Sequence, residues 1–152
     1  METNSRILAL DIGLKRTGVA ISDENQRISL PLTTLEASKR GEWVNKITKL
    51  IKESDGIGQI LVGIPLNHHG EEGADAIEIR KFVTLLRERT DLPVIEWDER
   101  FTTVQAERSL ITADVSRKKR KEVIDKIAAS IILQTYLDSL HFQETPAWDD
   151  TY

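Results

Sequence analysis

The chain has 152 residues, of which 39% are hydrophobic and 30% charged, with a formal net charge of −4 at pH 7. This balance is typical of a single soluble, folded domain and excludes an intrinsically disordered chain. No run of about 18 apolar residues is present and the first residues lack the layout of a signal peptide, so we expect a cytoplasmic protein without a membrane partner. The absence of cysteine excludes disulfides and leaves oxygen atoms as the ligands for any metal.

The chain opens with three short strand patterns. Residues 6–12 are apolar on both faces, which predicts a central strand covered by helices on each side. A tight basic turn leads to a second strand at 17–23, and a turn at 25–26 precedes a third strand that begins at residue 27. Pro31 cannot donate a hydrogen bond to a neighbouring strand, so it predicts that this strand lies at a sheet edge. Strands joined by such short turns run antiparallel.

Helices and strands alternate along the rest of the chain. Hydrophobic spacing and turn signals predict helix 41–53, strand 59–65, helix 74–89, strand 92–99, helix 102–111 and helix 118–140. Strands that follow a helical crossover run parallel. We therefore predict one α/β domain over residues 1–140 and a flexible acidic tail over 141–152. Its mixed five-stranded sheet has three antiparallel strands, then two parallel strands, with helices on both faces.

Carboxylates stand where three of these elements meet one edge of the sheet. Asp11 ends the first strand, Asp98 and Glu99 end the last strand, and Asp125 opens the most apolar helix. Ligands of such sheets bind beyond the carboxyl ends of the parallel strands. Taken alone, Asp11 could cap a hairpin turn and Asp125 could be a helix-start charge stabilised by the dipole. Because the three positions converge, a cluster is the better interpretation.

A cluster of carboxylates needs cations. Each acid raises the pKa of the others unless positive charge neutralises them. Mg²⁺ or Mn²⁺ does so with oxygen ligands and retained waters. Two such ions about 3.5–4 Å apart activate a water and stabilise the leaving oxygen of a phosphodiester. The pattern therefore indicates a metal-dependent hydrolase, with a two-metal site as the expected form.

Basic residues surround the proposed acids. Lys15 and Arg16 lie in the first turn, Arg100 follows the acids of the last strand, and a basic run precedes Asp125: Arg117, Lys118, Lys119, Arg120 and Lys121. Positive charge in a first helical turn opposes the dipole, so phosphate binding is favoured over a solvated helix start or a processing signal. The acidic net charge argues against indiscriminate coating of nucleic acid but not against a local basic surface. His68 and His69, on a glycine-flanked loop, are typical of exposed polar residues rather than ligands.

Four blocks carry a resemblance to a known family: LALDIGLKRTGVAISD, LVGIPLNHHGEEG, DERFTT followed by Ala106 and Glu107, and SRKKRKEVIDKIAASIILQTYLD. Over residues 6–140 the chain resembles the YqgF/RuvX family of bacterial Holliday junction resolvases, also named pre-16S rRNA nucleases. The resemblance implies a ribonuclease H-like fold, related to the RuvC resolvases. It also implies metal-dependent phosphodiester hydrolysis, a cytoplasmic location and a part in maturing the 5′ end of 16S ribosomal RNA.

The resemblance also assigns residues. It implies that Asp11, Glu99 and Asp125 are the catalytic metal ligands; Glu99 is preferred to Asp98 because a Glu ends the equivalent strand in the related resolvases. Glu122 is either a fourth ligand or part of a surface salt bridge. The acids do not distinguish RNA from DNA, so pre-16S rRNA is the expected substrate and branched DNA the alternative. A monomer or a homodimer is compatible, although symmetric cutting of a junction needs a two-fold dimer.

Two other functions remain to be weighed. Asp11-Ile12-Gly13 with Gly18 also resembles the first phosphate loop of actin-like ATPases, but a second such loop and an adenosine motif are missing from the sequence. The chain is also less than half the usual size of that superfamily. The other possibility is a nucleic-acid-binding assembly factor without catalysis, against which the retained acids argue.

Overall fold

The computed structural model describes residues 5–13, 15–66, 69–101 and 117–142; for residues 101 and 117–122 it describes the backbone alone. None of the helices in these ranges has the length and apolarity that crossing a membrane requires.

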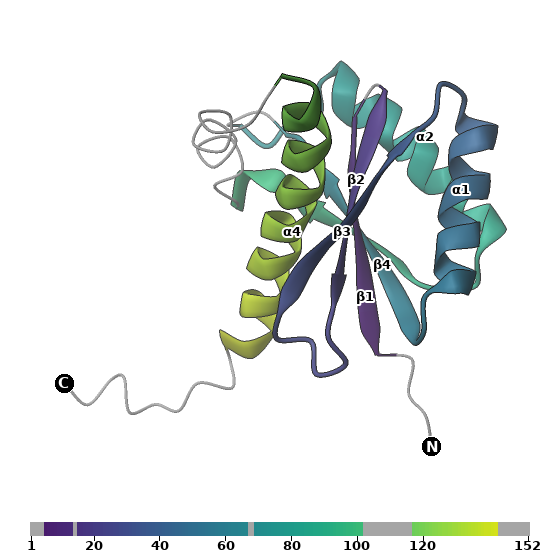
Figure 1. The fold of residues 1–152 in the computed structure, drawn as a ribbon. Coiled ribbons are helices and arrows are strands. Elements are labelled where there is room, and N and C mark those ends of the chain that lie inside the picture. The colour runs from purple at the N-terminus through teal and green to yellow at the C-terminus, as the bar shows by residue number, and fades with distance from the viewer. Residues whose placement is uncertain (1–4, 14, 67–68, 102–116, 143–152) are drawn as a thin grey trace.

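A five-stranded sheet forms the middle layer of the molecule (Figure 1). Its strands are β1 (Arg6–Ile12), β2 (Arg16–Ser22), β3 (Ser29–Glu36), β4 (Ile57–Ile64) and β5 (Val94–Asp98), in the spatial order β3-β2-β1-β4-β5. The first three strands pair antiparallel, and β4 and β5 pair parallel to β1 and to each other. The predicted mixed sheet is confirmed, and β3 lies at its edge as Pro31 indicated.

Helices cover both faces of the sheet (Figure 1). They are α1 (Arg40–Glu53), α2 (Ala74–Arg89) and α4 (Arg117–Phe142), and the short 3₁₀ turn η1 (Glu99–Phe101) follows β5. The helices α1 and α2 pack on one face, and α4 crosses the other. The helix predicted at 102–111 and the part of the predicted tail beyond residue 142 lie outside the described residues.

The central strand supplies both hydrophobic cores. Side chains alternate along a strand, so Leu8 and Leu10 face α1 and α2, whereas Ile7 and Ala9 face α4. All four are fully buried. The strand β1 is therefore apolar on both faces because helices cover it on both sides, as the sequence predicted.

The third strand begins two residues later than predicted. The backbone N–H groups of Arg27 and Ile28 donate to the Asp23 carboxylate at 2.8 and 2.9 Å, so they belong to the turn. Gln26, in the same turn, has a positive φ of 57°. Local side-chain acceptors of this kind compete with the sheet for backbone donors.

A buried serine completes the hydrogen bonding of β1. The backbone N–H of Ile7 donates to the Ser22 hydroxyl at 2.8 Å, and Ser22 is 3% exposed. We expect Ser22→Ala to lower the free energy of unfolding by about 1–3 kcal/mol, because it leaves a buried N–H without this acceptor. Urea unfolding measures the change, and Ser139→Ala at an exposed position is the control, expected within about 0.5 kcal/mol of the parent. An equal effect of the two substitutions would contradict the prediction.

Candidate functional site

A cleft opens at the end of the sheet where the carboxyl ends of β1, β4 and β5 lie. Its volume is about 1140 Å³, and the residues that line it come from these strand ends, from the β3–α1 connection and from α1, α2 and α4. They are Asp11, Ile12, Gly13, Ser38, Lys39, Arg40, Pro65, Leu66, Asp75, Glu78, Ile79, Phe82, Glu99, Arg100, Ile124 and Asp125. The cleft therefore lies beyond the carboxyl ends of the parallel strands, where sheets of this kind bind ligands.

The acids Asp11 and Asp125 approach each other across Gly18. Asp11 pairs with Gly18 in the β1–β2 ladder. On the α4 face, the backbone of Asp125 lies directly over Gly18, so closely that a Cβ atom there would overlap the Asp125 carbonyl group. Two carboxylates separated by more than 100 residues in sequence thus line the same cleft.

The third acid that lines the cleft is Glu99. The strand β5 ends at Asp98, and Glu99 begins the η1 turn. The Glu99 side chain packs over Gly63 of β4: a Cβ atom at Gly63 would lie 3.0 Å from the Glu99 Cγ. The neighbouring Asp98 does not line the cleft.

Asp98 is engaged by the arginine two residues further on. Its Oδ2 accepts from Arg100 Nε at 2.8 Å and Nη2 at 2.6 Å, and its Oδ1 accepts from the Arg100 backbone N–H at 2.9 Å. The side-chain hydrogen bonds from Arg100 hold the pKa of Asp98 below its usual value. Arg100 also packs over Gly70, whose φ is +79°. This pair places the Arg100 guanidinium at the cleft, next to Glu99 in sequence.

A second arginine neutralises an acid directly. Arg16 Nε donates to Asp125 Oδ2 at 2.8 Å, and the two side chains are 25% and 22% exposed. Such a partly desolvated pair is costly to break from one side, because the remaining charge loses its counter-ion. Lys15 is exposed in the preceding turn. For the basic run at 117–121 and for Glu122, the side chains lie outside the described residues.

The three acids have the right donor atoms for a metal site, but their side chains are not grouped around one point. Asp11, Glu99 and Asp125 offer oxygen donors, the type that Mg²⁺ and Mn²⁺ prefer. Among the described residues, however, no three His, Asp or Glu side chains are grouped to hold a metal ion as they stand. One Asp125 oxygen, Oδ2, is engaged by Arg16 at 2.8 Å. His69 is exposed and does not line the cleft, and His68 lies outside the described residues.

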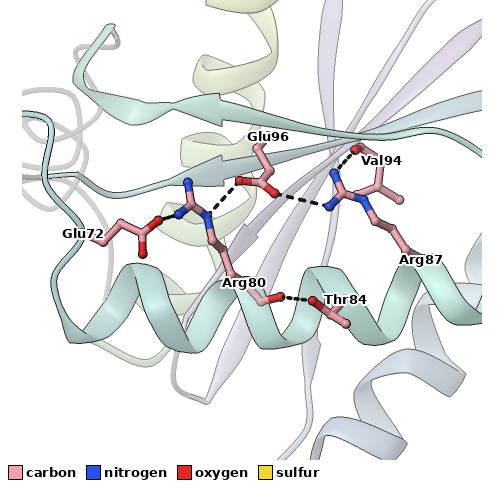
Figure 2. Close-up of polar contacts among 6 residues, drawn as sticks. All are labelled: Glu72, Arg80, Thr84, Arg87, Val94 and Glu96. Atoms are coloured by element: carbon pink, nitrogen blue, oxygen red, sulfur yellow. Dashed lines mark hydrogen bonds and ion pairs between the residues drawn. The ribbon is translucent and has the colours of Figure 1, made fainter.

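An ion-pair network supports the strand that leads to Glu99 (Figure 2). Arg80 of α2 donates to Glu96 of β5 at 2.9 Å and also pairs with Glu72, which follows β4. Two turns further along α2, Arg87 pairs with the other Glu96 oxygen at 3.4 Å and donates to the Val94 carbonyl at 2.6 Å. The network fastens β5 and the β4–α2 connection to α2.

Sequence reasoning missed both this network and the half of the cleft formed by α1 and α2. The predicted helix 74–89 contains Phe82, and the predicted helix 41–53 begins one residue after Arg40. A helical pattern does identify residues that share a face. It does not show that Arg40 and Phe82, from different helices, meet at one cleft.

Comparisons with known proteins identify the relatives of this chain. A model of the family described as "RuvX: Holliday junction resolvase" matches residues 5–139. A "Putative pre-16S rRNA nuclease" of Thermoanaerobacter pseudethanolicus is 49% identical over 135 residues, covering 88% of this chain and 96% of the relative. A protein of the same name from Geobacillus kaustophilus is 48% identical over 135 residues, covering 88% and 98%.

Two solved resolvases share the fold at low sequence identity. T. thermophilus RuvC, solved with a Holliday junction substrate, has a TM-score of 0.53 and 11% identity, with 90% of this chain and 96% of that chain covered. The fowlpox virus Holliday junction resolvase has a TM-score of 0.53 and 16% identity, with 89% and 99% covered. The fold is thus ribonuclease H-like, as predicted. The family model matches nearly the whole chain, and the two rRNA nucleases named above are 49% and 48% identical to it. The chain therefore belongs to the RuvX family.

Proposed function

We propose that this protein is a cytoplasmic nuclease that hydrolyses phosphodiester bonds of pre-16S ribosomal RNA, with divalent cations bound by Asp11, Glu99 and Asp125. The observation that carries the proposal is that these three acids, from β1, η1 and α4, line one cleft together with Arg100. The choice of RNA rests on the names of relatives that are nearly half identical to this chain over most of its length.

The proposed roles follow from the chemistry of the side chains. Mg²⁺ or Mn²⁺ bound by the three acids would supply an activated water and neutralise charge at the leaving oxygen. Arg16 limits the repulsion between the acids by pairing with Asp125. A guanidinium has five N–H donors, and Asp125 takes the Nε donor of Arg16, so other donors of this side chain suit a phosphate. Arg100, held by Asp98, supplies a second fixed positive charge.

A second candidate function is cleavage of a four-way DNA junction. It is favoured by the description of the matching family and by the fold shared with two junction resolvases. Symmetric cleavage of a junction requires two copies of the site related by a two-fold axis. Trimming an RNA end requires one.

Cleavage assays on the two substrates test the proposal. A 5′-extended 16S rRNA precursor and a four-way DNA junction, both end-labelled, are incubated with the protein in Mg²⁺, in Mn²⁺ and with excess EDTA. We expect cleavage of the precursor that EDTA abolishes. Cleavage of the junction alone would establish the second candidate, and binding of the RNA without cleavage under all conditions would instead indicate an assembly factor.

Gly63 provides a more selective test of Glu99. A methyl group at Gly63 would lie 3.0 Å from the Glu99 Cγ and 3.1 Å from the Ile132 Cδ1. Both are flexible side-chain atoms, so we expect Gly63→Ala to fold, at a stability cost of about 1–2 kcal/mol. The displaced carboxylate should lower the rate of RNA cleavage about tenfold to a hundredfold.

The matched control for this variant is Gly41→Ala. A Cβ atom at Gly41 meets no atom within 4 Å, so this substitution should leave the cleavage rate unchanged. If Gly63→Ala cleaved RNA at the wild-type rate, the prediction that cleavage depends on where the Glu99 carboxylate lies would be wrong.

A further inference from the structure

The cleft continues beyond the acids to a second end between α1 and α2. We call this the aromatic end; it is lined by Ser38, Lys39, Arg40, Asp75, Glu78, Ile79 and Phe82. None of these residues belongs to the acid group or to the basic residues identified from the sequence. In chain order they come from the connection after β3, from the first residue of α1 and from the first nine residues of α2.

The aromatic end contains a braced stack. The guanidinium carbon of Arg40 lies 5.6 Å from the centre of the Phe82 ring. Phe82 in turn meets the buried Trp43 edge to face, with ring centres 4.8 Å apart and an angle of 81°. Trp43 Nε1 donates to Thr17 Oγ1 at 2.8 Å, and Thr17 adjoins Arg16, the partner of Asp125. The stack is therefore fixed in position relative to the acid end of the cleft.

The charged residues of the aromatic end are balanced, two basic and two acidic, which suits the edge of an uncharged base better than a phosphate. Arg40 Nη2 lies 3.1 and 3.2 Å from the two Glu78 oxygens, and Lys81 Nζ lies 3.1 Å from one of them. Asp75 lies one turn before Glu78 on α2 and adds a second carboxylate. Carboxylates repel phosphate but accept hydrogen bonds from the amino groups on base edges. Guanidinium planes and aromatic rings are the surfaces on which unpaired bases stack.

We propose that the aromatic end binds an unpaired nucleobase of the substrate, stacked on Arg40 and Phe82, with its amino edge toward Asp75 and Glu78. The inference rests on the proposed nuclease function, and it adds a requirement that the function alone does not impose. The substrate must present a single-stranded nucleotide in the same cleft as the scissile phosphate. Lys39, at the rim of this end, supplies charge for the backbone of that nucleotide.

Binding without cleavage tests the inference separately from catalysis. Fluorescence anisotropy with a labelled 12-nucleotide single-stranded RNA of mixed sequence, and with its duplex, is measured in EDTA. We expect Phe82→Leu to weaken binding of the single strand about tenfold, the size of one base–aromatic stack, and to leave duplex binding unchanged. Phe142→Leu makes the same chemical change at a ring that is 77% exposed at the end of α4, and it should alter neither affinity.

Two substitutions of Arg40 distinguish the contribution of stacking from that of charge. The Arg40 side chain is 44% exposed, so we expect both variants to fold. Arg40→Lys keeps the charge and removes the plane, so it should weaken single-strand binding about two- to fivefold. Arg40→Gln removes both and should weaken it further.

Full single-strand affinity in both Phe82→Leu and Arg40→Lys would overturn the inference, as would an equal loss on the duplex, which indicates contact with the backbone. If Phe82→Leu fails to fold, Arg40→Lys decides alone. Cleavage of the rRNA precursor by the wild-type protein tests the proposed function, and its outcome does not depend on the binding results for these variants.

Discussion

Gly18→Ala is expected to lower the free energy of unfolding by about 3 kcal/mol or more, at the upper end of the cost of overpacking a core. A Cβ atom at Gly18 would overlap the carbonyl group of Asp125 and lie 2.9 Å from the backbone nitrogen of Lys126. These are backbone atoms of α4, so no side-chain rotation relieves the contact. The helix must move away from β2, which opens the core around Ala128 and Ala129, both fully buried.

Chemical unfolding followed by circular dichroism measures this loss, and the contrast with Gly41→Ala identifies its cause. Gly41 lies in α1 with open space around its Cα, so alanine there should raise the stability, by up to about 1 kcal/mol. A general intolerance of the fold to glycine replacement would lower the stability of both variants. Wild-type stability of Gly18→Ala would show that α4 does not press on β2 at this point.

Because Asp125 lies at the same contact, Gly18→Ala also bears on function. Moving α4 changes the distance between Asp125 and Asp11, and it breaks the geometry of the Arg16–Asp125 pair. We therefore expect cleavage of the rRNA precursor to fall more than the population of folded protein does at the assay temperature. This prediction assigns Gly18 two roles, the packing of α4 on β2 and the placement of Asp125 near Asp11.

Asp11→Asn is expected to abolish cleavage, with a loss well above about a hundredfold, since even outer-shell partners of metal sites cost up to that much. The amide preserves the size of the side chain and removes its charge. Asparagine at this position also lowers the negative charge of the cleft, so the affinity for RNA in EDTA should not fall. Single-turnover cleavage of the precursor in Mg²⁺, together with anisotropy in EDTA, measures the two properties.

Asp98→Asn is the informative comparison for Asp11→Asn. Asp98 does not line the cleft and is held by three hydrogen bonds from Arg100. Its replacement should loosen Arg100 and reduce cleavage by about tenfold, far less than Asp11→Asn does. Equal losses in the two variants would place Asp98 among the ligands, and full activity of Asp11→Asn would refute the proposed site.

The choice between Asp98 and Glu99 illustrates the limit of strand periodicity. Neighbouring residues on a strand face opposite ways, so both were candidates from the sequence. The structure ends β5 at Asp98 and turns the chain into η1, which carries the Glu99 side chain over Gly63. Where a strand stops depends on its pairing with β4, which continues as far as the Ile64–Asp98 pair. Pairing between strands is not a local property of either sequence.

Local sequence patterns predicted the five strands, the helices at 41–53, 74–89 and 118–140, and where along these elements the acids lie. Hydrophobic periods of two and 3.6 residues report which faces are buried, which is why the predicted 6–12 strand and 74–89 helix coincide with β1 and α2. Short turns and helical crossovers likewise determined which strands run antiparallel and which parallel. Three features arise only when the elements pack together: the Arg16–Asp125 pair, the network of Arg80 with Glu72 and Glu96, and the aromatic end of the cleft. Each of these depends on the packing of elements that are distant in sequence, and no local pattern specifies which side chains will then meet.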